Sequence, residues 1–202
     1  RDFVAAARLY EKACGLGDPD GCALGARLRG EGLAGAEAPD AVIEQARRGC
    51  SGRSGAWCWV LGTLLERFGP ATAVSMREAS NSWAMACNLG FPAGCVATAE
   101  WIQRSAPGRK QVAIDNARRA CDAGEAAGCR IVADLQESVL PAFERDALLE
   151  RACTGGDGMA CMRSIWRVVR SDAQRGGVLF ARTNAWFAAG CDVGIAFDCG
   201  MQ

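Results

Sequence analysis

The sequence predicts an all-α fold, an α/α superhelix (solenoid) of about six two-helix repeats, and three regularities support this prediction. The 202-residue chain has 12 cysteines, which form six pairs that each read C-x7-C. The first cysteines of successive pairs are 36, 37, 34, 32 and 38 residues apart, a period typical of repeat arrays. Five of the six pairs have a glycine three residues after the first cysteine. The pairs are Cys14 and Cys22, Cys50 and Cys58, Cys87 and Cys95, Cys121 and Cys129, Cys153 and Cys161, and Cys191 and Cys199.

The spacing within each pair requires a reversal of the chain if its two cysteines are bonded. Eight residues of helix rise about 12 Å, and eight residues of strand span roughly 26 Å. A disulfide needs Cα atoms about 4.4–6.8 Å apart. The glycine favours the left-handed conformation in which helices commonly end. Each repeat is therefore predicted to be a helix, a turn and a second helix, with Arg53 in place of the glycine in the second repeat.

The residues at two places, four and one before the first cysteine, indicate one packing face on the first helix. The residue four positions before it is mostly bulky or aliphatic, and the residue immediately before it is small in all six repeats. Positions three apart share a helix face, so we expect the helices to approach closely there and Trp83 to lie in the core. The first set is Tyr10, Ala46, Trp83, Ala117, Leu149 and Phe187, and the second is Ala13, Gly49, Ala86, Ala120, Ala152 and Gly190.

The same signals place the helices and repeats along the chain. First helices are predicted over 2–14, 40–50, 74–88, 110–122, 142–154 and 179–190. Second helices are predicted over 20–30, 55–67, 93–104, 126–138, 158–170 and from 194 onward. The repeats are approximately 1–34, 35–70, 71–107, 108–140, 141–176 and 177–202, the last incomplete. We expect them to stack into one right-handed solenoid domain over 1–202 with an extended groove.

Composition and missing motifs exclude several function classes. The chain has no histidine, and its 23 basic residues equal its 23 acidic ones. A histidine-based triad or metal site is excluded, and nucleic acid is a disfavoured partner. The sequence contains no S-x-x-K nucleophile motif, no phosphate-binding loop and no apolar stretch long enough for a membrane span. We predict no cofactor and no catalytic residue. The only catalytic option that the missing motifs leave open is an enzyme built solely from carboxylates.

Several segments resemble the Sel1-like repeat (SLR), a relative of the tetratricopeptide repeat. They are LYEKACGLGDPDGCALG at residues 9–25, RRACDAGEAAGCRIVADL and LERACTGGDGMACMRSIW. Cysteines at both helix positions make the chain similar to the Helicobacter cysteine-rich protein (Hcp) family, a secreted, disulfide-rich branch. That branch has been linked to penicillin binding or weak β-lactamase activity, for which the missing S-x-x-K motif offers no support. Arg53 and Arg145 depart from the usual pattern, as does the incomplete last helix.

We interpret the 12 cysteines as six structural disulfides, one within each repeat. Such bonds would stabilise an alanine-rich chain with a modest core, and they predict a secreted, periplasmic or cell-surface location. The alternative is metal binding by thiolates. Zinc sites usually separate paired cysteines by two to four residues, so the C-x7-C spacing fits a zinc site poorly.

Arginines near the first cysteine and two neighbouring tryptophans are the candidate protein-binding residues. They are Arg47, Arg48, Arg118, Arg119, Arg151, Trp57 and Trp59. The arginines predict a cationic ladder that binds carboxylates or an acidic partner. Alternatively, they complement the helix dipole at the end of each first helix. Exposed tryptophan beside arginine is typical of binding hot spots, whereas local packing is the other explanation for both rings. Carboxylate pairs such as Asp18 and Asp20, or Glu144 and Asp146, are attributed to helix capping and solvation.

The leading functional hypothesis is a secreted or periplasmic scaffold that binds a protein or peptide partner without catalysis. The alternatives are an Hcp-type enzyme that binds or hydrolyses a cell-wall or peptide substrate, and a structural subunit of an extracellular assembly. The chain starts in a first helix and stops three residues after Cys199. Since solenoid ends need covering, we expect at least one terminal face to contact another subunit or further repeats of a longer chain.

Overall fold

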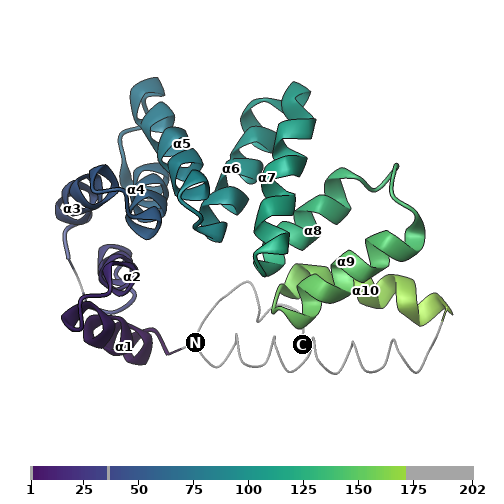
Figure 1. Cartoon of the computed structure of the whole chain (residues 1–202), viewed down its shortest axis with the longest axis horizontal. Helices are drawn as coiled ribbons and strands as arrows, with labels where there is room; N and C mark the ends of the chain where they lie inside the picture. The colour runs from purple at the N-terminus through teal and green to yellow at the C-terminus, as the bar shows by residue number, and fades with distance from the viewer. Residues whose placement is uncertain (1, 36, 172–202) are drawn as a thin grey trace. The chain divides into compact units, whose positions relative to one another are not determined.

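A computed structural model describes residues 2–35 and 37–171, and these residues form ten α-helices and one short 3-10 helix (Figure 1). The helices follow one another as pairs, in agreement with the all-α repeat prediction. The pairs are α1 (Phe3–Gly15) with α2 (Pro19–Gly30), α3 (Pro39–Ser51) with α4 (Gly55–Phe68), α5 (Ala73–Asn88) with α6 (Pro92–Ser105), α7 (Lys110–Asp122) with α8 (Ala126–Leu135), and α9 (Ala142–Thr154) with α10 (Gly158–Ser171). The 3-10 helix η1 (Pro107–Arg109) precedes α7.

The predicted helix boundaries agree with the structure to within three residues. The largest difference is at α8, which was expected to reach residue 138 and ends at Leu135. The predicted sixth repeat, with its helices over 179–190 and from 194 onward and the pair Cys191 and Cys199, lies outside the described residues.

Contacts group the chain into two compact units, and each is described by itself. The N-terminal unit comprises Asp2–Trp101 and contains α1 to α5 with most of α6. The C-terminal unit begins at Ile102 and contains α7 to α10 in its described part. The single solenoid domain over 1–202 stays a prediction.

The core of the N-terminal unit centres on α4, which contacts both α3 and α5. Val60 and Leu64 on this helix are fully buried. Trp83 of α5 is 2% exposed and lies against Gly62 of α4, where a Cβ atom would come within 2.5 Å of the indole Nε1. Trp83 is therefore a core residue, as expected, and its large ring requires glycine opposite it.

One core cluster of the C-terminal unit combines small side chains with a disulfide. Ala133, Ala152 and Ala160 pack with Leu149 and with the fourth-repeat cysteines Cys121 and Cys129. The unit also buries the larger side chains Ile114, Ile131 and Val132. Because alanines bury little apolar area each, the disulfide adds restraint where this cluster has few large side chains.

Five disulfides are present in the described residues, and each joins the two helices of one pair. Their Cα–Cα distances are 4.4–4.6 Å, at the short end of the range for disulfides. They join Cys14 to Cys22, Cys50 to Cys58, Cys87 to Cys95, Cys121 to Cys129, and Cys153 to Cys161. The thiolate-metal alternative does not apply to these bonded cysteines.

A left-handed residue follows each of the five described first helices beside its disulfide. The third residue after the first cysteine has a positive φ in all five described turns, and at Arg53 it is 64° although the residue is not glycine. The amide of this residue donates to the carbonyl of the first cysteine, and the next amide donates to the carbonyl just before that cysteine. These two bonds form a Schellman motif, which satisfies the last carbonyls of the helix. The left-handed turn predicted from the glycine position is thus present even where the glycine is missing.

We expect removal of one disulfide to lower stability without changing the fold. In the chain-entropy model, opening a nine-residue loop costs about 2.6 kcal/mol of unfolding free energy. The double variant Cys121→Ala with Cys129→Ala should show a loss of this order in urea unfolding, with helical circular dichroism retained before the transition. Mass mapping of the variant under non-reducing conditions is the control, since it must show the other bonds intact. An unchanged unfolding midpoint would show that this bond does not stabilise the chain.

Candidate protein-binding grooves

Two open grooves lie between consecutive first helices, one in each unit. The N-terminal groove lies between α3 and α5, with the buried Leu61 of α4 among its lining residues, and has a volume of about 560 Å³. The C-terminal groove lies between α7 and α9, with the buried Val132 of α8 among its lining residues, and has a volume of about 420 Å³. Both volumes are within the range of ligand sites in proteins.

The two grooves are formed by the same positions of the repeat. Counted from the first cysteine, nine of the ten lining residues of each groove occupy positions −3, 0, +1 and +11 of one repeat and positions −13, −9, −6, −5 and −2 of the next. In the N-terminal groove these are Arg47, Cys50, Ser51, Leu61, Val74, Glu78, Asn81, Ser82 and Met85. In the C-terminal groove they are Arg118, Cys121, Asp122, Val132, Leu140, Glu144, Ala147, Leu148 and Arg151. The tenth differs: it is Arg77 at position −10 in the N-terminal groove and Gln136 at position +15 in the C-terminal groove. The grooves are therefore one structural feature that recurs in different repeat pairs.

An ion pair crosses the N-terminal groove. Arg47 of α3 donates from Nε to Oε1 of Glu78 on α5 at 2.7 Å, and from its terminal nitrogen to Oε2 at 3.0 Å. Arg47 also contacts Glu44. The hydrogen bonds to Glu78 raise the pKa of Arg47 further above its ordinary value. This bidentate arrangement joins two first helices and compensates the charge of Arg47.

The C-terminal groove has arginines with neutral partners. Arg118, at the position of Arg47, donates to the side-chain oxygen of Gln136 at 2.7 Å. Arg151 of α9, at the position of Met85, donates to the backbone carbonyl of Cys121 at 2.6 Å, near the C-terminal end of α7. Arg151 therefore contacts the C-terminal end of the preceding first helix and not that of its own helix, so the expected role at its own helix end stays a prediction. Both guanidinium groups also line the groove.

The remaining arginines of the predicted ladder lie outside the two grooves. Arg48 on α3 and Arg119 on α7 are exposed, and neither is a lining residue. The structure thus brings Arg118 and Arg151 together in one groove, places Arg47 in the other, and separates Arg48 and Arg119 from both.

Trp57 is a core residue, which corrects its assignment to a binding surface. Its side chain is 7% exposed and fills the space beside Gly49, where a Cβ atom would overlap the indole ring. In three other described pairs, glycine precedes the second cysteine and contacts alanine before the first. The second repeat reverses the arrangement: the large residue is on the second helix, and the glycine is on the first.

Trp59 of α4 is half-buried and belongs to a different surface, formed with α2 and the turn between α5 and α6. The guanidinium carbon of Arg27 on α2 lies 4.6 Å from the ring centroid, and the ring of Phe91 lies 5.6 Å away. Such stacking of arginine and aromatic rings is a cation–π contact. Trp59 is not a lining residue of either groove, so these contacts give it a packing role between repeats.

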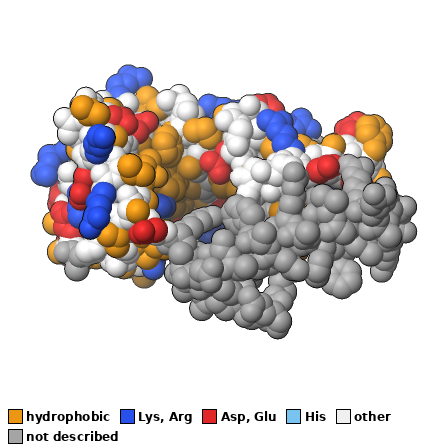
Figure 2. Space-filling model, turned by 90° about the horizontal axis from the view of Figure 1, so that it is seen from below, with side chains coloured by type: hydrophobic (Ala, Val, Ile, Leu, Met, Phe, Trp, Pro, Cys, Tyr) orange, Lys and Arg blue, Asp and Glu red, His pale blue; other side chains and the backbone are white. Residues whose placement is uncertain are grey.

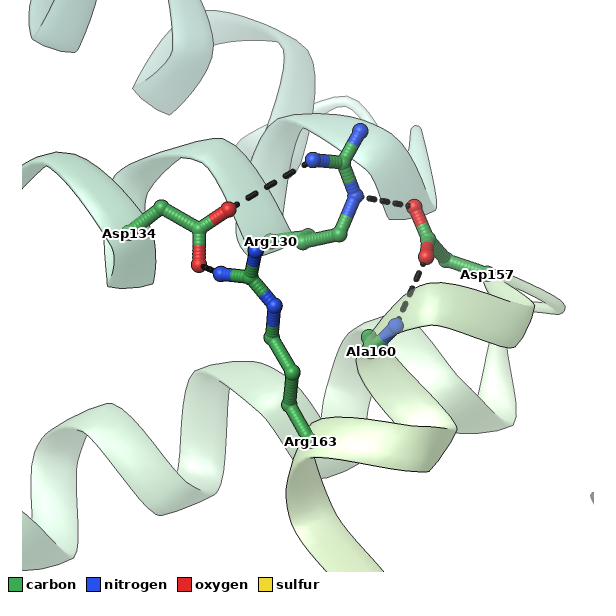
Figure 3. Close-up of polar contacts among 5 residues, drawn as sticks. All are labelled: Arg130, Asp134, Asp157, Ala160 and Arg163. Carbon is green, nitrogen blue, oxygen red and sulfur yellow. Dashed lines mark hydrogen bonds and ion pairs between the residues drawn. The ribbon is translucent and has the colours of Figure 1, made fainter.

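The C-terminal unit has ionic groups where the N-terminal unit has this aromatic stack. Arg130, like Trp59, directly follows the second cysteine of its repeat, and its Nε donates to Asp157 at 2.8 Å (Figure 3). Asp157 also accepts a hydrogen bond from the backbone N–H of Ala160 at 2.8 Å, and this bond caps the start of α10. Asp134 links Arg130 to Arg163. This network therefore joins α8 to the start of α10 and acts in packing between repeats.

The groove residues that the sequence did not single out come mainly from the later of the two first helices that form each groove, which is α5 in one groove and α9 in the other. They include Glu78, Met85 and Leu148, together with Leu140 just before α9. A signal for the helical ones exists, because positions −9, −6, −5 and −2 are spaced by three residues or are neighbours and follow one helix face. Alignment of the repeats by their cysteines would have shown this face.

Within residues 2–35 and 37–171, no group of three or more histidine, cysteine or acidic side chains is arranged to hold a metal ion. The helices described here include none that is long and apolar enough to cross a membrane.

Gly49→Ala should destabilise the protein because the new methyl group would overlap the ring of Trp57. Overpacking of this kind typically costs about 1–3 kcal/mol. Gly15→Ala is the matched control, since it is also a helical glycine but has no atom within 4 Å of the added methyl group. It should be neutral or stabilise by up to about 1 kcal/mol through helix propensity. Equal free energies of unfolding for the two variants would contradict the tight contact at Trp57.

Glu125 should make the free energy of unfolding depend on pH. Burial raises the pKa of Glu125 above its ordinary value, and the negative charge of Asp157 adds to this increase. A carboxyl group whose pKa is raised by folding costs stability once it ionises. Glu125→Gln should therefore raise the free energy of unfolding at neutral pH, and the gain should disappear as the pH falls below about 4.3, the ordinary value. A gain that persists at low pH would show a non-ionic origin.

Comparisons with known proteins identify the fold. No known family profile matches the chain, and no curated protein matches it either. Among solved structures, a protective antigen present in uropathogenic Escherichia coli strains and displaying an SLR fold is similar, with a TM-score of 0.69 and 16% identity. The alignment covers 93% of this chain and 43% of the antigen, so the chain spans less than half the length of that protein.

A Sel1 repeat protein from Oxalobacter formigenes is similar as well, with a TM-score of 0.67 and 12% identity over 95% of this chain and 80% of that one. Identities this low show the fold alone. Together with the helix pairs described above, they show that the chain has the Sel1-like repeat fold.

Proposed function

We propose that the chain is a disulfide-stabilised scaffold that binds segments of partner proteins in the grooves between its first helices. The observation that carries this proposal is the recurrence of one groove, built from the same repeat positions, in both units. Repeated grooves along a helical array are the usual means by which solenoid proteins bind extended partners. Arg47, Arg118 and Arg151 belong to this surface, and Arg48 and Arg119 would act only outside the grooves.

The disulfides support a location outside the cytoplasm. Five bonds in the described residues would be exceptional in a reducing compartment, whereas disulfide-rich chains are common in the periplasm, at the cell surface and outside the cell. A periplasmic or secreted location is therefore part of the proposal.

The charge pattern supports a protein partner over a polyanion. On the face shown in Figure 2, basic and acidic side chains are interspersed over the described part of the chain. The net charge of the whole sequence is zero. Nucleic-acid binding depends on clustered positive charge, and a mixed surface is better suited to a protein.

Site-specific photo-crosslinking tests the proposal. A photoreactive phenylalanine analogue is placed at Met85 and at Ala147, one in each groove, and at Met159 as the control. Met85 and Met159 are exposed to similar extents, 47% and 48%, but only Met85 lines a groove. In the native compartment, the groove positions should give the same protein adducts, identified by mass spectrometry, and Met159 should give few.

Equal adduct yields at all three positions, or no adducts at the groove positions, would contradict binding in the grooves. Turnover of a peptidoglycan panel by the purified chain, abolished by groove substitutions, would contradict a scaffold without catalysis.

A further inference from the structure

A second surface of the N-terminal unit, formed by α2, α4 and the turn between α5 and α6, has a positive charge without a carboxylate partner. We infer that Arg27, stacked on Trp59 beside Phe91, binds an acidic side chain of a partner protein, with an apolar residue next to that acid placed on the two rings. None of the three residues lines either groove, so the inference adds a binding surface beyond the proposed function.

Arg27 is a half-buried cation with no hydrogen-bond acceptor. Its guanidinium carbon lies 4.6 Å from the centroid of the Trp59 ring. Within the described chain its side chain forms no hydrogen bond and no ion pair, and its buried Nε has no partner. A cation that is partly removed from water costs free energy unless it is paired. Since a guanidinium group has five N–H donors, the terminal nitrogens of Arg27 have donors left for an anion.

The acidic residues nearest to Arg27 along the α2 segment have other contacts. Asp20 lies two helical turns earlier, and its carboxyl group forms a hydrogen bond with the side chain of Ser54. Glu31 directly follows α2, and its side chain is 7% exposed with Oε2 lying 3.9 Å from Arg67. Neither carboxylate forms an ion pair with Arg27 in the described chain. The charge of Arg27 is therefore left for a group from outside the chain.

The equivalent positions of the C-terminal unit contain charges of both signs. Counted from the first cysteine, position +13 is Arg27 in the first repeat and Asp134 in the fourth. Asp134 pairs with Arg130 of its own repeat and with Arg163 of the next (Figure 3). For Arg27 the next repeat supplies the ring of Trp59, which attracts a cation without neutralising it. The pattern that is complete in one unit thus lacks its anion in the other.

The make-up of this surface indicates an acidic side chain beside an apolar one. One guanidinium group matches one carboxylate, to which it can donate two parallel hydrogen bonds, whereas nucleic acids require clustered cations. The half-buried rings of Trp59 and Phe91, with centroids 5.6 Å apart, supply apolar area next to the cation. Tryptophan and arginine are also enriched among the residues that dominate protein interfaces. A glutamate followed by phenylalanine fits both parts of the surface.

A peptide titration followed by NMR tests the inference with the full, oxidised chain. The probe is acetyl-Gly-Glu-Phe-Gly-amide, and two comparison peptides replace its glutamate by glutamine or its phenylalanine by glycine. The readout is the indole N–H resonance of Trp59. We expect the probe to shift this resonance and to bind about tenfold more tightly than the glutamine peptide, as for hydrogen bonds to a charged group. The peptide without phenylalanine should also bind more weakly than the probe.

Variants separate the cation from the rings. Arg27→Gln should abolish the preference for glutamate over glutamine, whereas Arg48→Gln, on an exposed arginine outside this surface, should leave it unchanged. Phe91→Ala keeps the Arg27–Trp59 stack and should reduce only the preference for phenylalanine. Circular dichroism checks that each variant is folded. If Arg27→Gln does not fold, Arg27→Lys replaces it, since lysine keeps the charge but lacks the paired donors and should reduce the preference for glutamate.

Four results would overturn the inference. They are equal affinity for the glutamate and glutamine peptides, a preference that persists in folded Arg27→Gln, tighter binding of inorganic phosphate than of the probe, and no shift of the Trp59 resonance at millimolar peptide. Each of them leaves the crosslinks at Met85 and Ala147 unaffected, because those positions lie in the grooves. Failure of this inference is therefore distinguishable from failure of the proposed function.

Discussion

The disulfide beside the left-handed turn is the constraint on which the rest of the structure depends. In each described repeat it holds the end of the first helix and the start of the second with Cα atoms 4.4–4.6 Å apart. At this separation two bulky residues cannot face each other beside the bond, so Trp57 is accommodated only because Gly49 is opposite it. Once the helix pairs are closed in this way, equivalent positions face one another across the grooves between α3 and α5 and between α7 and α9.

This arrangement separates the scaffold from recognition. The cysteines, the turn residue and the small contact residues define the helix pair, and the groove positions vary without altering it. Position −2 is Met85 in one groove and Arg151 in the other, and position −5 is Ser82 in one and Leu148 in the other. The second-helix surface varies similarly, since Trp59 packs on Arg27 and Phe91 whereas Arg130 pairs with Asp157. Two units of the same fold can therefore present different chemistry.

Sequence analysis predicted the fold well because the period and the turn are local features. The spacing of the cysteines and the glycine position were enough to predict the helix pairs, and the predicted left-handed turn holds even at Arg53. The site was predicted less completely, because it depends on contacts between repeats. That Arg47 would pair with Glu78 follows only when α3 and α5 are placed side by side. Burial of Trp57 depends on the space left by Gly49 on another helix, which periodicity alone does not show.

Hydrogen–deuterium exchange measured by mass spectrometry tests most directly whether the disulfide-closed turn holds each helix pair. The comparison is between the oxidised wild-type chain and the double variant Cys50→Ala with Cys58→Ala. Because the bond restrains its own repeat, the account predicts faster amide exchange in α3 and α4, over Pro39–Ser51 and Gly55–Phe68, with little change in α7 to α10. Unchanged exchange in α3 and α4, or an equal increase in every helix, would contradict it.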